Sequence, residues 1–252
     1  MKIDLVIHSS DSNPFYLDFW PLVSKVWKEH FKLNPILLYI DENHDIPIDE
    51  TYGKVIKMKP ISDVPLYLQC LWIRYWYPTQ VPDQVCMISD IDMFPISKNY
   101  FIEQIKNIAD DKYVHLNPTH NFLPSCYHIA KGKLFKEVLK LEDEWMESVT
   151  ALYNKNLGSD CFAQAPNNPI LEGKQQWGAD EEYATKCIRS YADQTIFEFI
   201  ERKHCRIDRS NWIYSISQIE NDMYADSHSI RPYEKYKYQI DSLLSIIYSL
   251  DT

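Results

Sequence analysis

The most informative stretch of this chain is VCMISDID at residues 85–92. Its first four residues are apolar, which is typical of a short strand buried on both faces of a parallel sheet. Asp90 and Asp92 follow this strand. The carboxyl ends of parallel strands border the ligand crevice of open α/β sheets, so we expect both carboxylates at a binding site. Alternate residues of an extended segment share a face, which predicts that the two acids point together.

The sequence before this stretch alternates between strand and helix patterns. Residues 2–8 and 35–40 are apolar runs of buried-strand type, each followed by polar residues, and residues 54–59 resemble a more exposed strand. Helical spacing of apolar residues follows Pro14, with Pro21 as an expected kink, and a second helix is predicted from Asp63 to Pro78. This order predicts an α/β fold with a mostly parallel sheet flanked by helices.

The second half of the chain continues with sheet and helix patterns. Strands are expected near residues 113–116 and 126–130, and a helix near residues 99–109. One long helix is predicted from Lys133 to Leu152, because a single apolar stripe runs through it. Further helices are expected from Asp180 and from Tyr233. No repeat or linker interrupts the pattern, so residues 1–252 are expected to form one domain.

Composition excludes several classes of function. The net charge of −10 argues against general nucleic-acid binding, which needs clustered Lys and Arg. No apolar run approaches the roughly 20 residues that cross a bilayer, and a cytoplasmic location is expected. The six cysteines contain no Cys-x-x-Cys pair, so we expect reduced thiols rather than a zinc site or disulfides.

Asp90 and Asp92 are suited to a divalent cation that carries phosphate. Carboxylate oxygens hold such cations and leave coordination positions for phosphate oxygens. Two other classes of protein use similar sequences. The haloacid-dehalogenase phosphatases need Thr or Val at the fifth position of the motif, where this chain has Phe94. A calcium-binding EF-hand loop needs Gly at the sixth position and Glu at the twelfth, occupied here by Pro95 and Phe101.

With its alternating strands and its Asp-x-Asp triplet, the chain resembles the GT-A glycosyltransferases, which use nucleotide diphosphate sugars. The resemblance implies a nucleotide-sugar-binding half at residues 1–100, and an acceptor-binding half with a closing helix at residues 101–252. It also implies contacts to the nucleoside from the ends of the first two strands, and a donor contact from the helix before the triplet. The residues at these positions are Ser9, Ser10, Asp11, Asp41, Gln69 and Arg74.

A second motif, WGADEE at residues 177–182, is similar to the Trp-Gly-Gly-Glu-Asp-Asp segment of inverting galactosyltransferases. In that segment the turn contacts the acceptor and an acid provides the general base. The similarity implies that Trp177 and Gly178 contact the acceptor, and that Glu181 is the base with Asp180 beside it. Acids at a helix start can also simply complement the helix dipole.

The resemblance further implies a late histidine as a metal ligand, and His228 is in a suitable place. Asp92 and His228 are therefore expected to hold Mn²⁺ or Mg²⁺, with Asp90 on the ribose or on a metal-bound water. Arg231 is expected to neutralise donor phosphates. The expected reaction moves a sugar from a uridine diphosphate donor to a carbohydrate hydroxyl, and inversion at the anomeric carbon is favoured.

Two alternatives stay open at this stage. A nucleotidyltransferase has a similar fold, but it usually carries a Gly-rich phosphate loop after the first strand, where this chain has no Gly. A nucleotide-sugar-binding module without turnover fits the same residues. It would bind the donor with a metal ion and release no diphosphate.

Overall fold

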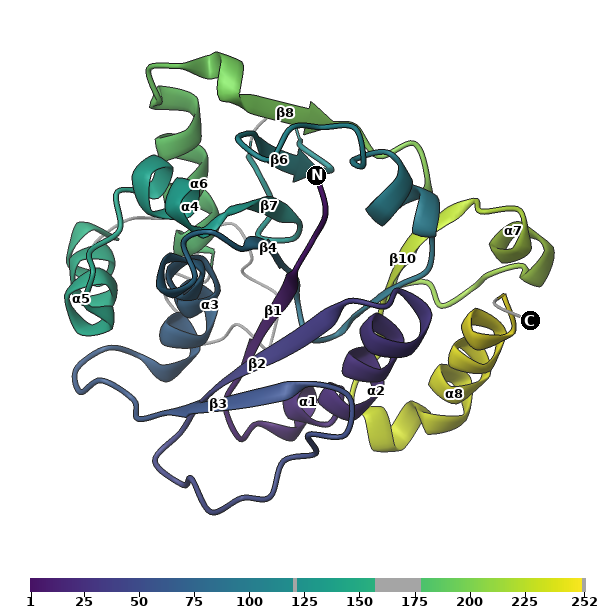
Figure 1. Ribbon diagram of the computed structural model, residues 1–252. Helices are drawn as coiled ribbons and strands as arrows, with labels where there is room; N and C mark the ends of the chain where they lie inside the picture. The colour runs from purple at the N-terminus through teal and green to yellow at the C-terminus, as the bar shows by residue number, and fades with distance from the viewer. Residues whose placement is uncertain (120–121, 157–177, 251–252) are drawn as a thin grey trace.

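A computed structural model describes residues 1–119, 122–156 and 178–250. Its centre is a seven-stranded sheet (Figure 1). Of these strands β7 alone runs antiparallel to its neighbours, so the prediction of an α/β fold with a mostly parallel sheet is confirmed. In spatial order the strands are β3 (Lys54–Met58), β2 (Asn34–Ile40), β1 (Leu5–Ser10), β4 (Val85–Ile88), β7 (His128–Lys131), β6 (Tyr113–Leu116) and β8 (Phe197–Ile200).

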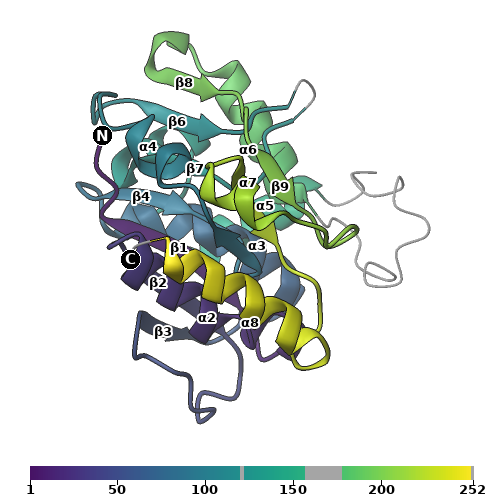
Figure 2. The ribbon, with the colours of Figure 1, turned by 90° about the vertical axis from the view of Figure 1, so that its right-hand side faces the viewer.

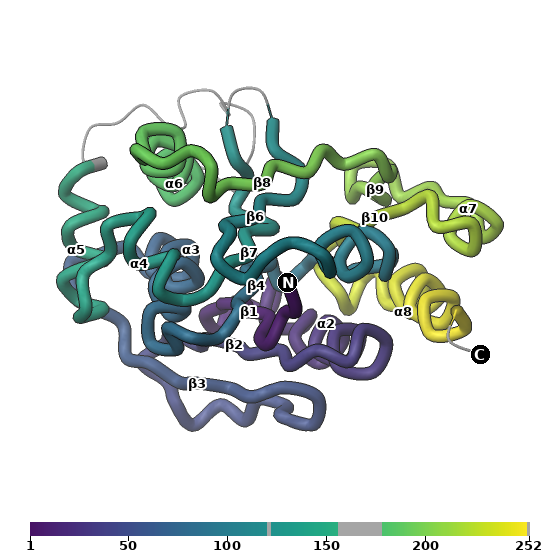
Figure 3. The backbone as a smooth tube through the Cα atoms, turned by 45° about the horizontal axis from the view of Figure 1, so that its top comes forward, coloured from purple at the N-terminus to yellow at the C-terminus, as the bar shows by residue number. Residues whose placement is uncertain are grey.

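Helices cover both faces of the sheet. On one face lie α3 (Leu66–Trp76), α4 (Gly132–Leu139), α5 (Trp145–Asn156) and α6 (Ala179–Ser190). On the other lie α2 (Trp20–Lys25) and the C-terminal helix α8 (Tyr233–Ser249), which are neighbours in Figures 2 and 3. Two hydrophobic cores result. Val6 packs in one and Ile7 in the other, as expected for a strand whose faces are both buried. Among the described residues, no helix is long and apolar enough to cross a membrane.

The helical segment after β1 is broken rather than kinked. Asn13 caps α1 (Pro14–Leu17), and its Oδ1 accepts a 3.0 Å hydrogen bond from the N–H of Phe15. Pro21 lies in the first turn of α2, where its missing N–H costs little, and α2 runs into a π-helical turn, η1 (Val26–His30). The predicted cap at Asp63 is wrong: Asp63 has a φ of 67° and α3 begins after Pro65.

The long helix predicted from Lys133 is in fact two helices, α4 and α5. The chain leaves the helical conformation at Lys140, where φ is 53°, and the exposed acids that follow favour solvent. The apolar stripe that suggested one helix is still buried on both sides of the break, at Leu134, Val138, Leu141, Trp145, Val149 and Leu152. The helix expected at residues 99–109 shrinks to a π-helical turn, η3 (Asn99–Glu103), followed by turns.

A second, three-stranded sheet lies beside the first and is absent from the predictions. Its order is β5 (Met93–Pro95), β10 (Tyr224–His228) and β9 (Cys205–Ile207), next to the short helix α7 (Ile216–Glu220) (Figure 3). Buried Asp226 anchors β10: the Arg206 guanidinium donates two hydrogen bonds of 2.7 Å to it and the Tyr127 hydroxyl donates one of 2.9 Å. This sheet fixes the position of His228.

Candidate active site

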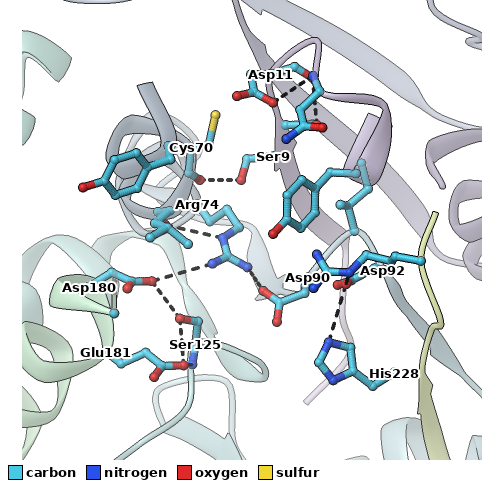
Figure 4. Close-up of a pocket in the computed structure, with 18 of the residues that line it drawn as sticks. Ser9, Asp11, Cys70, Arg74, Asp90, Asp92, Ser125, Asp180, Glu181 and His228 are labelled. Atoms are coloured by element: carbon cyan, nitrogen blue, oxygen red, sulfur yellow. Dashed lines mark hydrogen bonds and ion pairs between the residues drawn. The ribbon is translucent and has the colours of Figure 1, made fainter. Parts of the chain in front are cut away.

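A cavity of about 190 Å³ opens at the carboxyl ends of β1 and β4 (Figure 4). The two halves of the chain both contribute to its lining. Most of the predicted site residues, although far apart in the sequence, meet in this one place. Those that line the cavity are Ser9, Ser10, Asp11, Arg74, Asp90, Asp92, Gly178, Asp180, Glu181, His228 and Arg231.

The Asp-Ile-Asp triplet is a turn and not an extended segment. The N–H of Met93 donates a 3.2 Å hydrogen bond to the carbonyl oxygen of Asp90, and the chain then enters the second sheet at β5. Ile91 is buried beneath the turn. The prediction that both acids point together is therefore wrong. Figure 4 shows the Asp90 carboxylate against Arg74 and the Asp92 carboxylate against His228.

Two guanidinium groups and an imidazole surround Asp92, and we call Asp92, Arg209, His228 and Arg231 the basic end of the cavity. Asp92 Oδ2 lies 3.2 Å from Arg209 Nη1 and 3.5 Å from both His228 Nε2 and Arg231 Nε. Burial by itself raises the pKa of Asp92. The interactions with His228, Arg231 and Arg209 outweigh burial and hold that pKa well below its usual range.

At the other end of the cavity, buried carboxyl groups surround Arg74. We call Asp90, Arg74, Asp180 and Glu181 the acidic end. Arg74 Nη1 pairs with Asp90, and its Nη2 lies 3.6 Å from Asp180 Oδ2. The side chains of Arg74 and Asp180 are 4% and 1% exposed, so their ion pair is shielded from water, whereas the Asp90 side chain is 35% exposed. The guanidinium charge is thus already balanced within the site.

Ser125 holds the two acids of α6 in place. Its hydroxyl donates a 2.7 Å hydrogen bond to Asp180 Oδ2, and its backbone N–H donates one of 2.9 Å to Glu181 Oε1. Burial, and then the neighbouring Asp180, raise the pKa of Glu181 to about 7. Burial also raises the pKa of Asp180, although Arg74 and Ser125 oppose that effect. A carboxyl group that titrates near neutral pH is suited to proton transfer.

The described residues offer fewer ligands to the predicted metal ion than expected. Among the described residues, no group of three His, Cys, Asp or Glu side chains gathers to hold a metal ion. Asp90 Oδ1 is taken by Arg74, so its direct contact with a metal ion is not supported. Asp92 Oδ2 and His228 Nε2, 3.5 Å apart, are close enough to share one ion, and carboxylate with imidazole suits Mn²⁺ or Mg²⁺. This pair needs phosphate or water oxygens to complete the coordination.

The loop after β1 forms a third part of the lining. Asp11 Oδ1 accepts a 3.0 Å hydrogen bond from the N–H of Asn13, and the Ser10 hydroxyl donates one of 2.9 Å to the carbonyl of Asp11. Asp41 does not line the cavity. Its Oδ2 accepts a 3.2 Å hydrogen bond from the N–H of Ser12, so it supports the loop from outside.

The predicted donor contact from Gln69 needs correction. Tyr67, Cys70, Leu71 and Arg74 share one face of α3 and line the cavity, whereas Gln69 is buried elsewhere. Its amide oxygen accepts from the Ile61 N–H, and its Nε2 donates to backbone carbonyls at 2.8 and 2.9 Å. Gln69 therefore ties down the segment before α3. Gly178 lies at the cavity, and Trp177 falls outside the described residues.

Several lining residues were missed, and three of them contact predicted site residues: Arg209, Tyr16 and Ser125. Arg209 follows β9 in a turn closed by Asp208, whose Oδ1 accepts a 2.9 Å hydrogen bond from the Ser210 N–H. In the sequence this turn looks like any polar loop. The ring of Tyr16 faces Arg231, whose guanidinium carbon lies 4.7 Å from the centre of that ring. Ser125 carries no sequence signal, because a lone Ser between Pro124 and Cys126 has no pattern around it.

Comparisons with solved structures find similar folds at low sequence identity. A glycosyltransferase involved in glycosylation of the major capsid of PBCV-1 is 10% identical, with a TM-score of 0.48, 95% of this chain covered and 100% of the other. The galactosyltransferase LgtC, in complex with donor and acceptor sugar analogs, is 10% identical, with a TM-score of 0.47 and coverages of 98% and 96%. The apo form of the glycosyltransferase GlyE of Streptococcus pneumoniae TIGR4 is 12% identical, with a TM-score of 0.49.

The GlyE match covers 99% of this chain and 64% of GlyE, so this chain spans just under two thirds of that protein. No protein-family model matches the chain, and no curated protein matches its sequence. Glycosyltransferase structures are thus among the folds to which the chain is similar, as the resemblance predicted. These likenesses concern the path of the backbone and assign no role to any residue.

Proposed function

We propose that this chain is a glycosyltransferase that moves a sugar from a uridine diphosphate donor to a hydroxyl group of a carbohydrate acceptor. One observation carries the proposal. A single cavity holds the guanidinium groups of Arg209 and Arg231 beside Asp92 at one end, and the buried Asp180 with the half-buried Glu181 at the other. The first suits a diphosphate and the second suits the removal of a proton, which are the two requirements of the transfer.

The donor diphosphate belongs at the basic end. Arg209 and Arg231 present guanidinium groups that match phosphate oxygens, and Arg231 is held against the ring of Tyr16. The loop with Ser9, Ser10 and Asp11 lines the same cavity and offers hydroxyl and carboxylate groups to the nucleoside. The donor sugar then lies toward Arg74 and Asp90.

A divalent cation is part of the proposal. Mn²⁺ or Mg²⁺ held by Asp92 and His228 would neutralise the charge that develops on the leaving diphosphate. Asp90 is proposed to contact the ribose or a metal-bound water through the carboxylate oxygen that Arg74 does not use. The two arginines of the basic end share in neutralising the phosphates.

Glu181 is proposed as the base of an inverting transfer. The acceptor oxygen bonds to the anomeric carbon of the sugar, while the bond from that carbon to the phosphate oxygen breaks and its electron pair leaves with the diphosphate. The acceptor proton passes to the Glu181 carboxylate. Ser125 orients this carboxylate through its N–H. Asp180 accepts a hydrogen bond from Ser125 and lies near Arg74, and we propose that it keeps these two side chains in position. Trp177 and Gly178 remain predicted acceptor contacts.

Binding and turnover together test the proposal. We expect UDP to bind in the presence of Mn²⁺, and at least one UDP-sugar to be hydrolysed slowly to UDP without an acceptor. Asp92→Asn is expected to abolish hydrolysis and to reduce UDP affinity in Mn²⁺ to its metal-free value, while the exposed variant Glu147→Gln on α5 keeps both activities of the wild type. UDP binding without hydrolysis of any donor would favour the non-catalytic module. Absence of UDP binding would contradict the proposal as a whole.

A further inference from the structure

The acidic end of the cavity carries more negative than positive groups. Asp90, Asp180 and Glu181 contribute three carboxyl groups, and Arg74 contributes one guanidinium. Asp180 is fully buried and Arg74 is nearly so, which means that water screens the charges of these two residues poorly, whereas Asp90 and Glu181 are half-buried. The basic end is the opposite, since the guanidinium groups of Arg209 and Arg231 flank the single carboxylate of Asp92 there. The cavity is therefore electrically polarised along its length.

The one cation of the acidic end is not available to a ligand charge. Arg74 pairs with Asp90 through Nη1 and faces Asp180 through Nη2, and its Nε donates to the carbonyl of Leu71 at 3.4 Å. Among the described lining residues, the other guanidinium groups belong to Arg209 and Arg231, which surround Asp92. A carboxylate that enters the acidic end thus meets like charges without a free counter-charge.

Sugar hydroxyl groups, unlike a carboxylate, interact favourably with the acidic end. Carboxyl oxygens accept hydrogen bonds, and each hydroxyl of a hexose is a donor that can satisfy one of these oxygens. The carboxyl groups of Asp90, Asp180 and Glu181 line the cavity and supply acceptors beside the proposed sugar position.

From these observations we infer that the transferred sugar is an uncharged one, and that sugars bearing a carboxylate are rejected at the acidic end. The inference rests on the proposed function, because that function places the donor sugar beside Arg74 and Asp90. It deepens that function by naming the class of donor: a nucleotide diphosphate linked to a neutral hexose or N-acetylhexosamine, and not to a uronic or sialic acid. Rejection follows from like charge in a poorly screened pocket.

The matched pair UDP-glucose and UDP-glucuronic acid tests this, since the two differ only in the hydroxymethyl or carboxylate group at carbon 6. Calorimetric titration in Mn²⁺ is expected to give UDP-glucuronic acid a Kd at least about tenfold higher than that of UDP-glucose, and higher than that of UDP. Equal or tighter binding of UDP-glucuronic acid overturns the inference and leaves the proposed function standing. Failure of UDP itself to bind overturns both.

Removing acidic charge should relax the selection. In Asp180→Asn, and separately in Glu181→Gln, we expect the ratio of the two Kd values to fall several-fold, because each variant replaces a carboxyl by a neutral amide of the same shape. Asp143→Asn, at an exposed residue outside the cavity, should keep the wild-type ratio. Thermal melting identifies a variant that fails to fold. The ratio of the two Kd values in the other variant then tests the assignment. An unchanged ratio in the folded variants overturns the assignment to these carboxylates.

Discussion

Arg209 Nη1 lies 3.2 Å from Asp92 Oδ2, the same oxygen that faces His228 and Arg231 at 3.5 Å. The Arg209 guanidinium therefore contacts the carboxylate that we propose as a metal ligand. An arginine here has two opposite effects on ligands. It competes with a metal ion for Asp92, and it attracts the phosphates of the donor.

Replacement of Arg209 by Met should separate these two effects. We expect UDP binding in the presence of a chelator to weaken by about tenfold or more, since a charge-assisted hydrogen bond is lost. Binding of Mn²⁺ without nucleotide, followed by electron paramagnetic resonance, should tighten because Asp92 loses a competing cation. Unchanged values in both titrations would show that Arg209 contacts neither ligand.

The two proposed metal ligands should affect the same measurement. In Asp92→Asn and in His228→Ala, the Mn²⁺ dependence of UDP binding is expected to disappear, so that titrations with and without Mn²⁺ give the same Kd. Asp208→Asn is the matched control: Asp208 lies 3.6 Å from His228 Nδ1 but does not line the cavity. A Mn²⁺ effect that survives in His228→Ala would remove the imidazole from the metal site.

Glu181→Gln tests the proposed base. Loss of a general base typically costs about 10²–10⁴-fold in rate, and we expect a decrease of kcat in that range with donor affinity largely kept. In the wild-type protein, kcat/KM should rise with pH and level off above about 7, because Glu181 accepts a proton only when ionised. If the variant retains the full transfer rate, another group accepts the proton.

The same carboxyl group links pH to stability. The folded protein holds the Glu181 proton up to pH about 7, whereas the unfolded chain releases it near 4.5. This contribution to stability is complete below 4.5 and is lost as pH rises toward 7. Chemical unfolding of wild type and Glu181→Gln should therefore show the variant gaining in relative stability over that interval. Glu147→Gln on the surface should run parallel to wild type, and a parallel curve for Glu181→Gln would contradict the raised pKa.

A fifth prediction concerns the second sheet. Asp226 is fully buried and bonded to Arg206 and Tyr127, so Asp226→Ala leaves a buried Tyr127 hydroxyl and the half-buried Arg206 guanidinium without their partner. Breaking such a pair costs about 3–5 kcal/mol in the free energy of unfolding, measurable by urea denaturation. Because β10 carries His228, Mn²⁺-dependent UDP binding should weaken as well. A loss below about 1 kcal/mol would mean that the pair contributes no more than an exposed one.

Much of the fold was predictable because burial leaves a clear pattern. Residues 85–88 form β4 as expected, since a strand covered on both faces is apolar throughout. The acids that follow it reach the cavity because strand ends in a parallel sheet share one edge. Gly178, Asp180, Glu181 and His228 also line the cavity, as the family resemblance implied.

What failed depends on contacts between distant residues. The strand β10 has the sequence YADSH, in which Asp226 interrupts the apolar pattern of a buried strand. This Asp is tolerated inside the protein because Arg206 neutralises its charge. The direction of Asp90 and Asp92 depends on Arg74 and Arg209, which lie on other elements. Gln69 has a suitable side chain for a donor contact, but it lies on a face of α3 that does not line the cavity. In each case the deciding partner is remote in the sequence, where periodicity gives no information.

Phosphorus NMR of a UDP-glucose reaction tests the proposed function most directly, because it shows which bond breaks. We predict that the chain with Mn²⁺ releases UDP and free glucose, through cleavage between the anomeric carbon and the phosphate oxygen, and that Asp92→Asn does not. Release of UMP and glucose 1-phosphate would mean cleavage within the diphosphate, and would contradict the assignment of this cavity to sugar transfer.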